Sequence, residues 1–112
     1  MKALIDGEVF LEDVIEARSM MERMRGLLGR KGLPAGTGML IDPCGSIHTF
    51  YMKFDLDVVF LDSEDRVVKL QKSIGPGRMA FGGYSARKIL EMESGKVDMQ
   101  RIREGSQVKF AS

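Results

Sequence analysis

The sequence contains one cysteine and no tryptophan, and none of its apolar runs approaches the roughly 20 residues that a membrane-spanning helix needs. A single cysteine cannot form an intramolecular disulfide, so the chain shows no adaptation to an oxidising compartment. Asp6 and Glu8 come too early for the hydrophobic part of a secretory signal. From these absences we expect a soluble, cytoplasmic protein with no membrane partner.

An excess of charge of one sign is also missing, since 17 Lys and Arg face 16 Asp and Glu. A net charge of +1 attracts neither nucleic acid nor an anionic membrane at long range. The two signs are nevertheless segregated along the chain. Residues 18–31 carry five cations and one carboxylate, whereas residues 42–65 carry six carboxylates and one cation.

This segregation has two interpretations. The two segments could face each other within the fold, or the basic segment could bind an acidic partner or a phosphate. The aromatic residues that stack on single-stranded nucleic acid are missing around these arginines. The sequence therefore disfavours nucleic acid, and it leaves a protein partner or a small anionic ligand open.

The length and composition are those of one globular domain, which we expect to span residues 1–112. Most of the chain shows the apolar–polar alternation that is typical of strands. Between residues 46 and 62 this alternation is too long for one strand of the usual five or six residues, so a bend is expected near Asp55. The second half is apolar on both faces and predicts an internal strand.

The predicted strands cover residues 2–5 and 8–17, joined by a tight Asp6-Gly7 turn, and then 38–42, 46–52, 56–62, 67–71 and 107–110. Residues 84–93 have the propensity of a helix and the alternation of a strand, and the break at Ser94-Gly95 favours the strand. Glycine-rich loops are expected at residues 30–38 and 73–83.

One amphipathic helix is expected at about residues 19–28. Ser19 and Glu22 form a capping box at its start. A short late helix is expected at about residues 97–104, ending at Gly105. The fold class is therefore mainly β (α+β), a small antiparallel β-sandwich or barrel with these two helices. The residues expected on the apolar face of the first helix are Met20, Met21, Met24, Leu27 and Leu28.

Several blocks of the chain together resemble the domain-of-unknown-function family numbered 192. The resemblance covers roughly residues 10–110 and implies a compact, mostly β fold of sandwich type with no established activity. Some relatives in that family carry export signals. The blocks are Arg25–Arg30, Gly38–Leu40, Ile47–Phe54, Asp57–Asp62, Ile89–Met92 with Ser94-Gly95, and the closing Ile102, Gly105 and Val108.

Cys44 and His48 form the most conspicuous chemical pair, with the spacing C-x3-H. A thiol beside an imidazole could act as a nucleophile. Four residues of strand span about 13 Å, however, so the two side chains need not meet. We favour a small buried cysteine and a histidine at a strand edge. Because no complete catalytic or metal-ligand set is present, we predict no metal and no cofactor and leave enzymatic activity open.

Asp57 enters a strand face that continues as Val59 and Leu61, so its carboxylate needs a partner. Arg25 and Lys53 are the expected partners. We favour a structural role, in which Asp57 holds the helix or a loop in register through an arginine or backbone N–H groups. The alternative is a carboxylate that anchors a ligand.

Two hypotheses of function follow. The first is a small non-catalytic binding or accessory domain. The second is an enzyme or small-ligand-binding protein, in which Asp57 is an acid/base or an anchor and Arg25 holds an anionic group. They differ on whether Asp57, His48 and Arg25 converge on a cleft. The residues predicted to build that pocket are Arg25, His48, Tyr51, Asp57 and Glu91.

Overall fold

The computed structural model describes residues 1–27 and 29–112 and consists of three β-sheets, one α-helix and one 3-10 helix. No helix in this part of the chain is long and apolar enough to cross a membrane. The elements are β1 (Lys2–Ile5), β2 (Glu8–Leu11), β3 (Asp13–Ala17), α1 (Met20–Leu27), β4 (Thr37–Ile41), β5 (Ser46–His48), β6 (Leu56–Leu61), β7 (Val67–Ile74), β8 (Met79–Phe81), β9 (Lys88–Glu93), η1 (Met99–Arg101) and β10 (Val108–Ala111).

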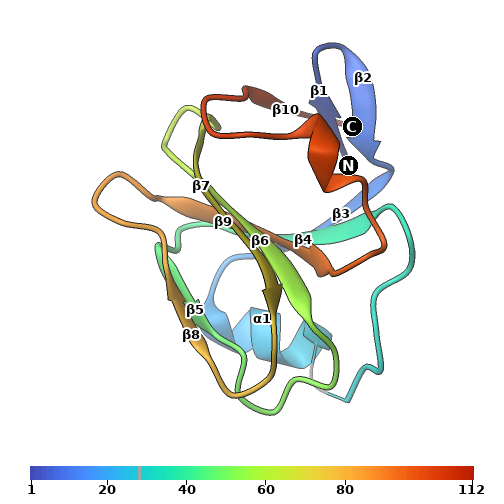
Figure 1. The fold of residues 1–112 in the computed structure, drawn as a ribbon, viewed down its shortest axis with the longest axis vertical. Helices are drawn as coiled ribbons and strands as arrows, with labels where there is room; N and C mark the ends of the chain where they lie inside the picture. Colours follow the sequence, from blue (N-terminus) through green and yellow to red (C-terminus); the bar gives the residue numbers. More distant parts are fainter. Residues whose placement is uncertain (28) are drawn as a thin grey trace.

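A five-stranded sheet in the order β3-β4-β9-β6-β7 forms the centre of the fold (Figure 1). Its pairs are antiparallel except β3–β4, which is parallel. The three-stranded sheet β10-β1-β2 and η1 pack on one face of it, and α1 with the two-stranded ribbon β5-β8 packs on the other. The predicted mainly β, sandwich-type fold is confirmed.

The alternation along the central strands divides the core into two parts. Leu56, Val58 and Phe60 of β6 pack on the side of α1 and the ribbon, whereas Val59 and Leu61 pack on the side of the three-stranded sheet. All six residues of β6 are buried, because β9 and β7 flank it and both of its faces are covered. The prediction of an internal strand here is confirmed.

Most local predictions hold, with some exceptions. The single strand predicted at 8–17 is wrong, because the chain breaks at Glu12 into β2 and β3, which belong to different sheets. The Asp6-Gly7 hairpin turn forms, with positive φ at both residues. The late helix is a single 3-10 turn inside the predicted range 97–104. The loop predicted at 73–83 is wrong in part, because Met79–Phe81 forms β8 and pairs with β5. The strand predicted at 46–52 ends at His48.

Helix α1 begins as predicted, with the backbone N–H of Glu22 donating to Ser19 Oγ at 3.2 Å. Its predicted apolar face is wrong in detail. Met21 is 65% exposed, and the two buried side chains of the helix are Leu27 and Arg23. Leu28 lies outside the described residues. A buried arginine requires a partner, and this requirement links the helix to the central sheet.

Candidate functional site

The five predicted site residues lie in four separate places. Arg25 is exposed on α1, where its Nη2 lies 3.5 Å from the Sδ atom of Met21. Asp57 and Glu91 are buried in different hydrogen-bonded groups. They lie on the paired strands β6 and β9, one register position apart, and their side chains bond to different partners. His48 ends β5, and Tyr51 follows it three residues later. The structure therefore does not bring Asp57, His48 and Arg25 to one cleft.

Asp57 is 4% exposed and ties neighbouring strands together. Its Oδ1 accepts hydrogen bonds from the backbone N–H of Ser73 at 2.9 Å and from the hydroxyl of Ser94 at 2.8 Å. The expected partners Arg25 and Lys53 were wrong, and the expected type of partner, a backbone N–H group, is present. These bonds join β6 to the end of β7 and to the segment after β9. They therefore favour one register of β6 against its two neighbouring strands.

Glu91 on β9 pairs with Arg23 on α1, and neither side chain has any exposed surface. Arg23 Nε donates to Glu91 Oε1 at 2.7 Å. Burial raises the pKa of Glu91 to about 7, although the Arg23 charge and hydrogen bond act in the opposite direction. Sequence reasoning missed Arg23. A signal for it was present, since Arg23 lies three residues after Met20 and four before Leu27, on the apolar stripe itself.

Cys44 has the features of a structural thiol. It is partly buried and donates to the carbonyl oxygen of Ser46 at 2.9 Å, and its sulfur lies 3.9 Å from that of Met20. Burial raises the pKa of Cys44, so the group is a neutral thiol at physiological pH. His48 instead stacks on Phe50, with ring centroids 4.9 Å apart. The Cys–His arrangement therefore provides no activated nucleophile.

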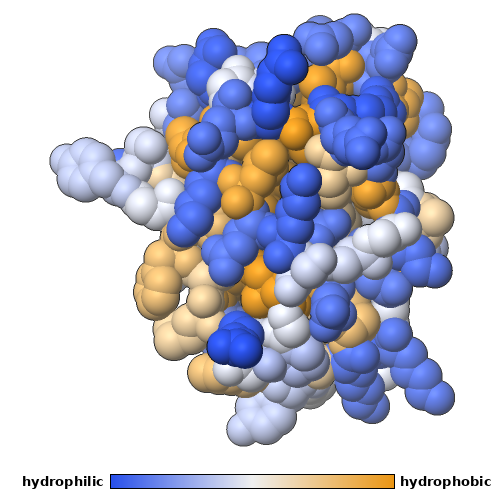
Figure 2. All heavy atoms as spheres, in the orientation of Figure 1, coloured by the Kyte–Doolittle hydropathy of each residue, from blue (hydrophilic) through white to orange (hydrophobic). Residues whose placement is uncertain are grey.

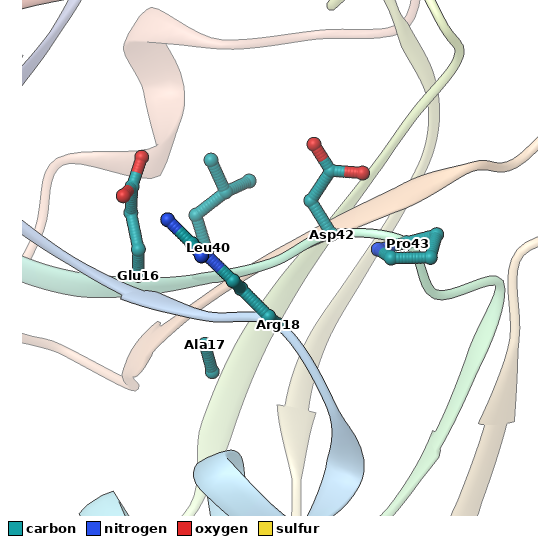
Figure 3. Close-up of a pocket in the computed structure, with 6 residues that line it drawn as sticks. All are labelled: Glu16, Ala17, Arg18, Leu40, Asp42 and Pro43. Atoms are coloured by element: carbon teal, nitrogen blue, oxygen red, sulfur yellow. The ribbon is translucent and has the colours of Figure 1, made fainter.

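The surface near the ends of β3 and β4 has a pocket of about 330 Å³ (Figure 3). The side chains of Glu16, Leu40 and Asp42 point to the same side of the chain there. The pocket is lined by Glu16, Ala17, Arg18, Leu40, Asp42 and Pro43. Its two carboxylates and one cation form no recognisable catalytic set.

Within residues 1–27 and 29–112, no three or more His, Cys, Asp or Glu side chains gather in a metal-binding group.

The β5–β8 ribbon exposes large apolar side chains. The register pairs His48 with Met79 and Ser46 with Phe81, so these four side chains share one face, while the Ile47–Ala80 pair points into the core. Met79 is 53% exposed and Phe81 58%. Apolar atoms are visible in Figure 2 along the left edge, where β5 and β8 lie in Figure 1. We define the ribbon face as His48, Phe50, Met79 and Phe81.

Tyr51 follows the ribbon face in an unusual conformation. Its φ is +67°, in the left-handed region that costs a residue with a side chain roughly 1–2 kcal/mol, and the side chain is 79% exposed. The preceding Thr49 is fully buried and fixes this turn. Its Oγ1 donates to the carbonyl of Gly75 at 2.7 Å and accepts from the N–H of Arg78 at 2.8 Å. Its carbonyl accepts from the N–H of Gly77 at 3.0 Å.

A basic concavity adjoins the ribbon face. It has a volume of about 440 Å³ and is lined by residues 71–76, 78 and 79, which include Lys72, Arg78 and the exposed Met79. No carboxylate lines it. The segments that form this side of the molecule, residues 46–54 and 69–84, carry four Lys or Arg and no Asp or Glu. An apolar face and a group of cations are therefore adjacent.

Comparison with known proteins agrees with this fold and adds no activity. The model of the family DUF192, Uncharacterized ACR, matches residues 3–110. A UPF0127 protein of Pyrococcus horikoshii is 32% identical over 110 residues, which cover 94% of this chain and 89% of that protein. A UPF0127 protein of Thermococcus sibiricus is 30% identical over 112 residues, covering 93% and 70%.

Among solved structures, a protein of unknown function from Novosphingobium aromaticivorans superposes with a TM-score of 0.74. It is 22% identical, and the alignment covers 87% of this chain and 74% of that one. At this identity the likeness shows the shared fold alone.

Proposed function

We propose that this chain, which belongs to the DUF192 family of uncharacterised proteins, is a non-catalytic binding domain that binds its partner through the ribbon face and Tyr51. The observation that carries the proposal is Tyr51, an aromatic side chain directed to solvent from a left-handed backbone conformation. Exposing an aromatic ring and adopting a strained φ both oppose folding stability. Such a combination is expected where the exposed ring has a function.

The rigidity of the surface supports the same proposal. The hydrogen bonds of buried Thr49 fix the turn that carries Phe50 and Tyr51 to the turn between β7 and β8. Aromatic residues and methionine are enriched at protein interfaces, and side chains that are ordered before binding lose less entropy on association. The ribbon face therefore offers contact area at a low entropic cost.

The distribution of the polar groups favours binding over catalysis. A general acid, a base and an anchoring cation act together only within hydrogen-bond reach of one substrate. Asp57, Glu91 and Arg25 do not meet this requirement. Asp57 and Glu91 bond to partners inside the protein, and Arg25 lies on the exposed side of α1. A ligand-binding role for these residues stays a prediction, as do a single domain over residues 1–112 and a cytoplasmic location.

A chemical-shift perturbation screen tests the proposal. The isotope-labelled protein is titrated with short peptides of acidic, basic and neutral composition, and with nucleotides, sugars and divalent metals. We expect at least one probe to shift the amide signals of His48, Phe50, Tyr51, Met79 and Phe81 as a contiguous group. The proposal is wrong if every bound probe maps elsewhere, for example to the pocket lined by Glu16 and Asp42, or if no probe binds.

A further inference from the structure

We infer that the partner of the ribbon face is an acidic polypeptide segment that also carries apolar side chains. The inference rests on the proposed function and adds the chemistry of the partner to it. It depends on three features of the surface: its charge, the kind of apolar group that it exposes, and the main-chain edge of β8 that faces away from β5.

The charge of this side of the molecule is mainly positive. Lys53, Lys72 and Arg78 are all exposed, and Lys72 and Arg78 line the concavity that Met79 also lines. Asp55, the first carboxylate beyond this basic segment, lies near Gly75 at its border. Carboxylates of a partner would find cations but no competing acid inside the concavity.

The apolar part complements the cations. Met79 and Phe81 lie two residues apart on one strand, so both side chains point to the same side at a spacing of about 7 Å. A partner in an extended conformation presents every second side chain at the same interval. Alternate apolar residues of such a segment can contact Met79 and Phe81, while flanking carboxylates reach Lys72 and Arg78.

The main chain of β8 favours a polypeptide. Hydrogen bonds from Thr49 N–H to the carbonyl of Arg78 and from Gly82 N–H to the carbonyl of Gly45 frame the β5–β8 pair. Because main-chain direction alternates along a strand, the N–H and C=O groups of Met79 and Phe81 point away from β5. Among the described residues, Lys69 Nζ alone is seen to bond there, donating to the carbonyl of Phe81 at 2.7 Å. A strand edge offers hydrogen bonds that only another polypeptide can pair in register.

Two other anionic partners fit less well. Long polyanions such as nucleic acid and acidic membranes depend on a strong positive field, and the whole chain has a net charge of +1. A short acidic segment needs only the local cations.

Selection from a displayed library of random short peptides tests the inference. Peptides are selected on the intact protein, and their affinities are measured at low and high salt. We expect the selected sequences to be enriched in Asp and Glu interleaved with aromatic or aliphatic residues, and to bind more weakly as salt increases. Oligothymidylate and vesicles containing phosphatidylserine are measured in parallel and should not compete.

Two pairs of variants separate the surface from the chemistry of its partner. Phe81→Ser should weaken peptide binding by about thirtyfold, whereas Tyr84→Ser, at an exposed tyrosine outside the ribbon face, should not. The double variant Lys72→Glu/Arg78→Glu should weaken binding by about tenfold or more. The matched control Arg103→Glu/Lys109→Glu makes the same change in net charge at exposed positions of another segment and should bind as the wild type does.

The outcomes differ for the two proposals. If the selected peptides are basic or uncharged but still lose affinity with Phe81→Ser, the acidic partner is wrong and the binding surface stands. If oligothymidylate or the vesicles displace the peptides, the acidic polypeptide is likewise the wrong partner and the binding surface stands. If no ligand responds to Phe81→Ser, the proposed function itself is wrong. Circular dichroism of each variant establishes that it is folded before its affinity is interpreted.

Discussion

Arg23 of α1 and Glu91 of β9 form an ion pair of 2.7 Å between side chains with no exposed surface, and this pair joins the helix to the central sheet. The Nη1 and Nη2 atoms of Arg23 and the Oε2 atom of Glu91 have no hydrogen-bond partner among the described residues. The attraction between the two charges must therefore offset the desolvation of both groups almost alone.

Removing one member of this pair should be more harmful than removing both. We expect Glu91→Leu to lower the free energy of unfolding by about 3–5 kcal/mol, because it leaves the buried guanidinium of Arg23 without its partner. Arg23→Met should cost less, because the carboxyl of Glu91, whose pKa is already about 7, can take up a proton and become neutral. The double variant should lose much less than the sum of the two. Denaturant unfolding measures all three. Arg25→Met, at an exposed position on the same helix, is the control and should change stability by at most about 0.5 kcal/mol. Additive losses would contradict the coupling.

The same pair should make stability depend on pH. The pKa of Glu91 is about 7 in the folded protein and near its usual 4.5 when unfolded. Between these values the folded state retains a proton that the unfolded state has released. The contribution of Glu91 to stability is therefore fully present below about pH 4.5 and is lost as the pH rises through about 7.

The comparison of wild type with Glu91→Gln isolates this contribution. As the pH is lowered from about 7 to about 5, the wild type should gain stability over the variant by up to about 1.4 kcal/mol per pH unit. Thermal unfolding across this range measures the difference, and the contributions of all other groups cancel because both proteins contain them. A constant difference would mean that Glu91 does not titrate there.

Asp57 should prove structural. Asp57→Ala removes the acceptor of the hydrogen bonds from Ser73 and Ser94, and it should lower the free energy of unfolding by about 3 kcal/mol. Asp57→Asn keeps an oxygen acceptor and should lose less. Asp55→Ala, at an exposed neighbour, serves as the control. Peptide binding by folded Asp57→Asn should equal that of the wild type, and a selective loss of affinity would instead place Asp57 in the ligand site.

The sequence predicted most of the fold because the decisive signals are local. The Asp6-Gly7 turn, the cap at Ser19 and the doubly apolar β6 each depend on residues that are close in the chain. The strand β8 was missed because its three residues lie in a glycine-rich segment and pair with β5 about 30 residues earlier. Such a short strand forms only in its tertiary context.

The site was harder to predict for the same reason. Arg23 is buried because of Glu91, which is 68 residues away. Along residues 46–54 the alternation gives Phe50, Met52 and Phe54 the same parity, but the chain leaves the strand after His48. Met52 and Phe54 then turn into the core and Phe50 outward. Periodicity predicts which residues share a face only while the chain remains in one strand, and here the strand ends after His48.

The central claim, that Tyr51 and the ribbon face form a binding surface, is tested most directly by measuring stability and affinity together in Tyr51→Gly. Glycine adopts a φ of +67° without strain, so the variant should be as stable as the wild type or more stable by up to about 1 kcal/mol. Its affinity for the acidic peptides selected on the wild type should fall by about thirtyfold, because an exposed aromatic anchor is lost. A Tyr51→Gly protein that is equally stable and binds these peptides with unchanged affinity would contradict the account.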